Sequence, residues 1–137
     1  IFYAITLNTS ASPNDKTYAQ QLKGAAILEP MWERLPNHPG IAHYLIHLYD
    51  YPAIADKGLK AAQKYASIAP GAPHAQHMPS HIFTRVGYWK ESIASNQASA
   101  KTARERIRKL PAKFMAIRLP LRRGLRSPLP PGIRMTA

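Results

Sequence analysis

The histidines of this chain are the residues best able to do chemistry, because they recur as spaced pairs. His43 and His47 lie four residues apart, and His77 and His81 repeat that spacing 34 residues later. Side chains four residues apart share one face of a helix, about 6 Å apart along its axis. Neutral imidazole is a common ligand for zinc and similar divalent metals. A metal site built from these four histidines is therefore one hypothesis for function.

Ordinary packing is the leading alternative explanation of the same histidines. Buried imidazoles are normally satisfied by hydroxyl, carboxylate or backbone groups, and several tyrosines lie close by in the sequence. Pro79 stands between His77 and His81, and a proline inside a helix removes a hydrogen bond and kinks the helix. If a helix begins at Pro79, His77 leaves the shared face.

The 34-residue interval also relates prolines, which indicates an internal repeat. Pro39 recurs as Pro73, and Pro36 recurs as Pro70. A period of this length is typical of the tetratricopeptide repeat, a helix–turn–helix unit that stacks on its neighbours to form an α-solenoid. The register divides residues 1–108 into repeat units over about 5–38, 39–72 and 73–106.

Small residues recur in this register where paired helices should cross closely. Gly24, Gly58 and Ser92 occupy the same position in the three units, and a larger side chain there would push the helices apart. We therefore expect an all-α fold of antiparallel helix pairs, with Asn14 or Asp15 capping the second helix. The expected helices span residues 1–9, 16–35, 39–49, 53 or 56–68, 74–85 and 89–108.

Positive charge is concentrated at the C-terminal end. The formal net charge is +12, yet residues 1–100 have eight Lys or Arg against six Asp or Glu, while residues 101–137 have eleven against one. Residues 109–137 are rich in Pro and Arg and lack helical periodicity, so we expect a disordered basic tail. The tail could bind nucleic acid electrostatically. Its composition also resembles the out-of-frame translation of a GC-rich gene.

Composition excludes several other classes of protein and site. The chain has no cysteine, so a disulfide framework and thiolate metal sites are excluded. No apolar run approaches the roughly 20 residues of a membrane helix, and we expect a soluble protein. No phosphate loop, dinucleotide fingerprint or nucleophile elbow is present. The opening residues Ile1 to Ile5 read as the middle of a helix, which suggests a fragment.

Two segments resemble a known group of proteins. The run HPGIAHYLIH from His38 to His47, followed by Tyr49-Asp50-Tyr51-Pro52, is similar to a segment of large, uncharacterised bacterial tetratricopeptide-repeat proteins. The run from Pro73 to Arg85 is similar as well, and the resemblance covers roughly residues 1–104. It implies an α-solenoid with further repeats, in the bacterial cytoplasm or periplasm. The group has no activity that could be carried over to this chain.

The leading hypothesis for function is a non-enzymatic scaffold that binds a protein or peptide on a concave helical surface. The first alternative is a zinc-like site, structural or hydrolytic, in which a divalent ion is the cofactor. The second alternative is nucleic-acid binding through the tail, and no membrane partner is expected. The residues that we expect on the concave surface are Tyr44, Tyr49, Asp50, Phe83 and Arg85.

Overall fold

A computed structural model describes residues 1–110, and these residues form helices joined by turns, with no strand among them. The predicted all-α class is confirmed for this part of the chain. The predicted disorder and nucleic-acid binding of the tail concern residues that lie almost entirely outside it, at 111–137. In chain order the helices are α1 (Phe2–Ser10), α2 (Ala19–Arg34), α3 (Pro39–Tyr49), the 3-10 helix η1 (Ala55–Gly58), α4 (Leu59–Ile68), α5 (Pro73–His77), α6 (Pro79–Arg85) and α7 (Trp89–Arg108).

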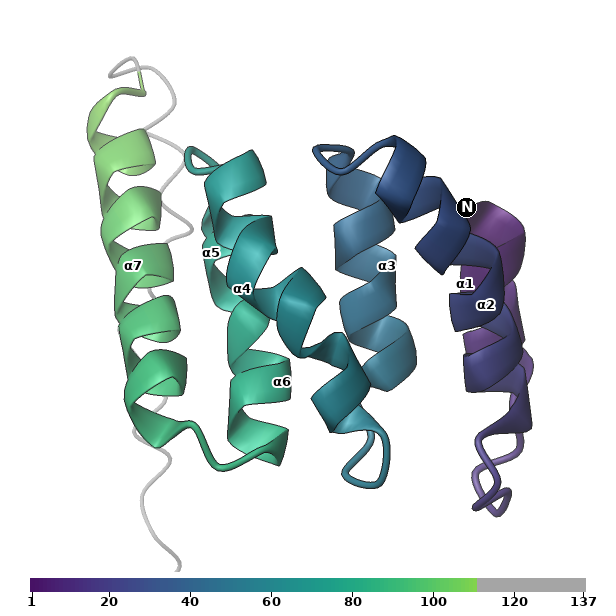
Figure 1. Ribbon diagram of the computed structural model, residues 1–137. Helices are drawn as coiled ribbons and strands as arrows, with labels where there is room; N and C mark the ends of the chain where they lie inside the picture. Colours follow the sequence, from purple (N-terminus) through teal and green to yellow (C-terminus); the bar gives the residue numbers. More distant parts are fainter. Residues whose placement is uncertain (111–137) are drawn as a thin grey trace, which may run out of the picture.

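The helices pack in chain order. Helix α1 contacts α2, α2 contacts α3, α3 contacts α4, and α4 contacts α5 and α6, which in turn pack on α7. Helix α3 also contacts α1 on one side and α6 on the other. Figure 1 shows the result as an array with α1 and α2 at one edge and α7 at the opposite edge. None of the helices described here has the length and apolar composition needed to cross a membrane.

Apolar side chains between the helices form one continuous core. Its members come from α1 to α6, so each helix buries one stripe against its neighbours. Burial of this apolar surface is the main favourable term for helices too short to be stable alone in water. The largest fully buried side chains are Leu28, Ile41, Leu45, Ile46, Leu48, Met78 and Ile82.

Glycines allow the closest approaches between helices. A Cβ atom at Gly24 would lie 2.7 Å from the backbone oxygen of Ala4, and one at Gly58 would lie 2.8 Å from Cδ1 of Ile82. Both separations are shorter than side chains tolerate, so the predicted close crossings at these two positions are confirmed. The equivalent residue Ser92 is buried, and its hydroxyl lies 2.8 Å from that of Thr84.

The start of α2 differs from the prediction. The helix begins at Ala19, after Tyr18 with a left-handed φ of 56°. Asp15 does not cap it. Its Oδ1 instead accepts hydrogen bonds from the backbone N–H and the hydroxyl of Thr17, at 2.8 and 2.6 Å, in the preceding turn. Asp competes for nearby backbone donors in this way, which favours a turn over an earlier helix start.

Pro79 divides the predicted helix 74–85 without changing its course. The chain is helical from Pro73 to His77 and again from Pro79 to Arg85. Met78 between them keeps helical dihedral angles, φ −52° and ψ −37°. Side chains four residues apart across the junction therefore still share a face.

Candidate metal centre

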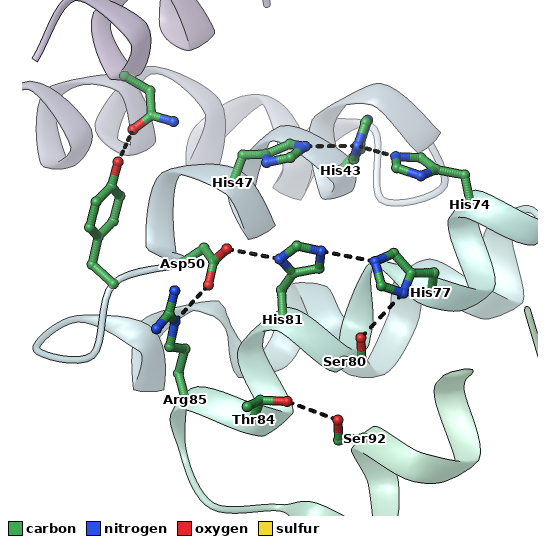
Figure 2. Close-up of polar contacts among 12 residues, drawn as sticks. His43, His47, Asp50, His74, His77, Ser80, His81, Thr84, Arg85 and Ser92 are labelled. Atoms are coloured by element: carbon green, nitrogen blue, oxygen red, sulfur yellow. Dashed lines mark hydrogen bonds and ion pairs between the residues drawn. The ribbon is translucent and has the colours of Figure 1, made fainter. Parts of the chain in front are cut away.

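Five of the six histidines gather on one side of the array, which we call the histidine face. Helix α3 carries His43 and His47, α5 carries His74 and His77, and α6 carries His81. Figure 2 shows their rings turned toward one another in two rows. The sixth, His38, stands apart as the N-cap of α3, where its Nδ1 accepts a hydrogen bond from the backbone N–H of Ile41.

The first row consists of His43, His47 and His74, which we call the trio. Nε2 of His43 lies 3.1 Å from Nε2 of His47 and 3.1 Å from Nε2 of His74. One ring nitrogen from each residue lies within 4.8 Å of the other two. Three potential ligand atoms from two helices thus converge on a single small volume.

The surroundings of His43 keep its ring fixed and neutral. The ring stacks on Tyr44 and Tyr65, with centroid separations of 5.2 and 5.5 Å. Burial, assisted by the neighbouring imidazoles, lowers the pKa of His43 to about 4. Burial also lowers the pKa of His47. Both rings are therefore neutral near pH 7, which is the form that binds a metal.

The second row contains His77 and His81, which we call the pair. Their Nε2 atoms lie 3.1 Å apart. The opposite nitrogen of each ring meets an oxygen, because Nδ1 of His81 lies 2.8 Å from Oδ2 of Asp50 and Nδ1 of His77 lies 2.7 Å from Oδ1 of Asn96. Hydrogen bonds at the two Nδ1 atoms thus orient the rings of the pair, and the two Nε2 atoms face each other.

Asp50 is the carboxylate of the histidine face. It caps the C-terminal end of α3, and its second oxygen accepts a hydrogen bond from Nε of Arg85 at 2.9 Å. Burial raises the pKa of Asp50, but the hydrogen bonds from His81 and Arg85 outweigh burial and hold the pKa below its usual value. Asp50 is therefore ionised near neutral pH and accepts a hydrogen bond from His81.

The four histidines predicted as one site fall into two neighbouring groups. His43 and His47 belong to the trio, and His77 and His81 form the pair. The rings of His47 and His81 are neighbours, with centroids 6.3 Å apart. His74 completes the trio, and sequence reasoning missed it as a ligand because its counterpart 34 residues earlier is Gly40. The available signal was its place one turn before His77 on the same face.

The five residues predicted for a binding surface fall into two sets, one buried in the core and one near the histidines. Tyr49 and Phe83 are only 4% and 8% exposed, so their prediction as surface residues is wrong. Their shared repeat position faces the core, where large aromatic rings bury the most apolar area. The hydroxyl of Tyr49 donates to Oε1 of Glu29 at 2.6 Å. The remaining three, Tyr44, Asp50 and Arg85, contact residues of the histidine face.

Comparison with protein-family models, curated proteins and solved structures finds no match for this chain. Clustered neutral imidazoles with converging nitrogens can bind a divalent transition metal. The carboxylate behind His81 is the kind of partner that commonly orients a metal-binding imidazole.

Proposed function

We propose that this chain is a metal-binding helical-repeat module in which the trio holds one divalent transition-metal ion. The observation that carries the proposal is the approach of Nε2 of His43 to Nε2 of both His47 and His74, at 3.1 Å each, with one ring nitrogen of each residue within 4.8 Å of the others. Packing histidines face hydroxyls, carboxylates or carbonyls. Nε2 of His43 instead faces two other imidazole nitrogens.

Hydrogen bonds among the three imidazoles cannot fully satisfy Nε2 of His43. A ring nitrogen presents either one proton or one lone pair. If Nε2 of His43 bears the proton, it can donate to only one of its two neighbours. If it bears the lone pair, His47 and His74 must both donate to that single lone pair. A cation at the meeting point interacts with all three lone pairs at once.

The distances and the ligand type favour a zinc-like ion. Zinc binds imidazole nitrogen at about 2.0–2.1 Å, which places ligand nitrogens about 3–3.5 Å apart in tetrahedral geometry. The two separations from His43, 3.1 Å each, fall in that range, while the ring nitrogens of His47 and His74 lie within 4.8 Å of each other. Imidazole suits zinc, copper, nickel and iron, whereas magnesium and calcium prefer oxygen ligands.

The position of the trio suggests a structural role for the ion. Its ligands come from α3 in the second predicted unit and α5 in the third. An ion bound there crosslinks two consecutive units and stabilises the folded chain by its binding free energy, about 2.7 kcal/mol at a free concentration of 100 times Kd. This proposal combines a tetratricopeptide-type solenoid with a metal site, and it assigns no catalytic step.

Thermal unfolding with and without zinc tests the proposal. Because the pair lies next to the trio, the comparison uses chains that carry His81→Gln. We expect micromolar zinc, but not magnesium, to raise the melting temperature of the chelator-stripped chain. Adding His74→Gln should remove most of this increase, since the side chain of His74 is an exposed ligand whose loss leaves the core intact.

His38→Asn provides the matched control. His38 lies outside the trio, and asparagine preserves its N-capping role. The His38→Asn chain should respond to zinc as its parent does. Equal stabilisation of the His74→Gln and His38→Asn chains, or no stabilisation of the parent, would contradict a metal site at the trio.

Protein binding remains a second candidate function, and one feature of α7 favours it. Trp89 and Ile93 are 61% and 58% exposed and lie four residues apart on the edge helix of the array. Exposed aromatic and aliphatic side chains on one helix face are typical anchors for a peptide partner. We propose an apolar peptide as the partner of this face.

Peptide selection from a random displayed library tests this second candidate. We expect apolar peptides that bind the whole chain and lose binding to the Trp89→Ser/Ile93→Ser variant. Leu22→Ser is the control, because Leu22 is an exposed apolar residue on the distant α2. Binding that survives the double variant, or that Leu22→Ser removes equally, would contradict the assignment.

A further inference from the structure

The hydrogen bonds behind the pair fix which nitrogen of each ring carries a proton. The ionised carboxylate of Asp50 can only accept, so Nδ1 of His81 donates to it. Asn96 is oriented by its own amide, which donates from Nδ2 to the backbone oxygen of Ser92 at 2.9 Å. Its Oδ1 therefore faces Nδ1 of His77 as an acceptor, and that nitrogen donates as well.

Both Nε2 atoms of the pair are consequently lone-pair nitrogens that face each other. In its neutral form, each of His77 and His81 has one ring proton, and Nδ1 holds it in both. Two lone pairs directed at each other across 3.1 Å repel unless a positive charge lies between them. The arrangement calls for a cation, either a proton or a metal ion.

We propose that His77 and His81 bind a second divalent transition-metal ion, separate from the ion of the trio, with Asp50 and Asn96 as positioning residues. Two histidines four residues apart on one helical face are an established metal-chelating arrangement. A carboxylate on the far nitrogen fixes the tautomer and raises the basicity of the ligand. The inference uses different residues from the proposed function and stands independently of it.

The second ion has open coordination positions, because the pair supplies only two ligands. A cavity of about 330 Å³ adjoins the pair. The guanidinium of Arg85 lies at this cavity and adds positive charge beside the ion. Water or a small carboxylate is therefore the ligand that we expect in the open positions. The cavity is lined by Asp50, His77, Ser80, His81, Thr84 and Arg85.

Zinc stoichiometry measured by equilibrium dialysis at pH 7.5 provides the first test. The whole chelator-stripped chain should bind two zinc ions. The His77→Gln/His81→Gln chain should bind one, and the His43→Gln/His47→Gln/His74→Gln chain should also bind one. If the proposed trio site fails but the pair is correct, the wild-type chain binds one ion, and only the change at the pair abolishes binding. Helical circular dichroism checks that each variant is folded.

Asp50→Asn separates a positioning role from a structural one. Loss of an outer partner of this kind typically weakens metal affinity about 10–100-fold. We expect that decrease in the His43→Gln/His47→Gln/His74→Gln background, where only the pair binds. In the His77→Gln/His81→Gln background, the affinity of the trio should change little. A loss of affinity of equal size in both backgrounds would show that Asp50 acts through the fold and would contradict its assignment.

Imidazole nitrogen NMR of the wild-type chain completes the test without any substitution. In the zinc-loaded chain, His77 and His81 should both carry a proton on Nδ1, and the two Nε2 signals should be shifted relative to the metal-free chain. A proton on Nε2 of either ring in the zinc-loaded chain would overturn the inference. Dialysis that shows equal zinc binding by the wild-type and His77→Gln/His81→Gln chains would also overturn it.

Discussion

Asp50 and His81 connect α3 to α6, with Oδ2 of Asp50 2.8 Å from Nδ1 of His81. Asp50 occupies the C-cap position of α3, while His81 lies on α6. Asp50 is also paired with Arg85 of the same helix, so one partly buried carboxylate serves two donors. This contact supports the fold and orients the pair.

Removing that carboxylate should destabilise the chain. Asp50→Ala leaves His81 and Arg85 without their acceptor, and losing a partner of this kind costs about 1–3 kcal/mol. Urea unfolding of the metal-free chain should show this loss. Asp56→Ala, at an exposed residue of η1, should change the free energy of unfolding by no more than about 0.5 kcal/mol. Equal effects of the two substitutions would contradict the role given to Asp50.

Adding one methyl group at Gly24 should be harmful, although alanine is the better helix former. The intrinsic gain is about 0.5–1 kcal/mol, whereas overpacking typically costs about 1–3 kcal/mol. The obstacle at Gly24 is a backbone oxygen 2.7 Å away, which cannot rotate aside, so overpacking should dominate. Gly71→Ala is the control, because a Cβ there meets nothing within 4 Å. A higher melting temperature for Gly24→Ala would show that α1 and α2 do not cross there.

Acidification should weaken the metal-free fold in the range below about pH 6.5. Burial and the surrounding imidazoles lower the pKa of His43 to about 4, from an ordinary value of about 6.5. Between these values the unfolded chain binds a proton that the folded chain does not, so stability falls as pH falls. Urea unfolding between pH 7.5 and 5 measures the slope. His43→Gln should make the slope shallower, and an unchanged slope would contradict the assignment to His43.

Duplicating one unit should lengthen the array without disrupting it. If residues 39–72 form a stacking unit, a second copy inserted after residue 72 buries the same interfaces again. We expect unchanged circular dichroism per residue, a higher melting temperature and a longer particle in small-angle X-ray scattering. Aggregation or loss of helix content in the duplicated chain would argue against a solenoid register.

The repeat interval predicted the helices well where local signals agreed with it. Pro39 starts a helix as expected, the helix expected from residue 74 begins one residue earlier at Pro73, and Gly87, with φ of 80°, ends the segment before α7. The start of α2 was missed because Asp15 satisfies the backbone of Thr17 within a turn. Such a local hydrogen bond between a side chain and the backbone does not change the periodicity of the sequence, so the repeat pattern could not predict it.

The candidate site was predicted less completely, because its geometry depends on contacts between helices. The repeat identified four of the five clustered histidines but could not identify His74, which has no counterpart. It also could not separate the trio from the pair, since that division depends on which rings meet across α3 and α5. Tyr49 and Phe83 were placed on the surface because an aromatic residue at one repeat position suits both a binding groove and a core.

X-ray absorption at the zinc edge tests the central claim most directly. The His81→Gln chain loaded with one equivalent of zinc isolates the trio. We predict a first shell at about 2.0–2.1 Å, with scattering from three imidazole rings that falls to two in the chain that also carries His74→Gln. A shell of oxygen atoms alone, or the same imidazole count in both chains, would contradict metal binding by His43, His47 and His74.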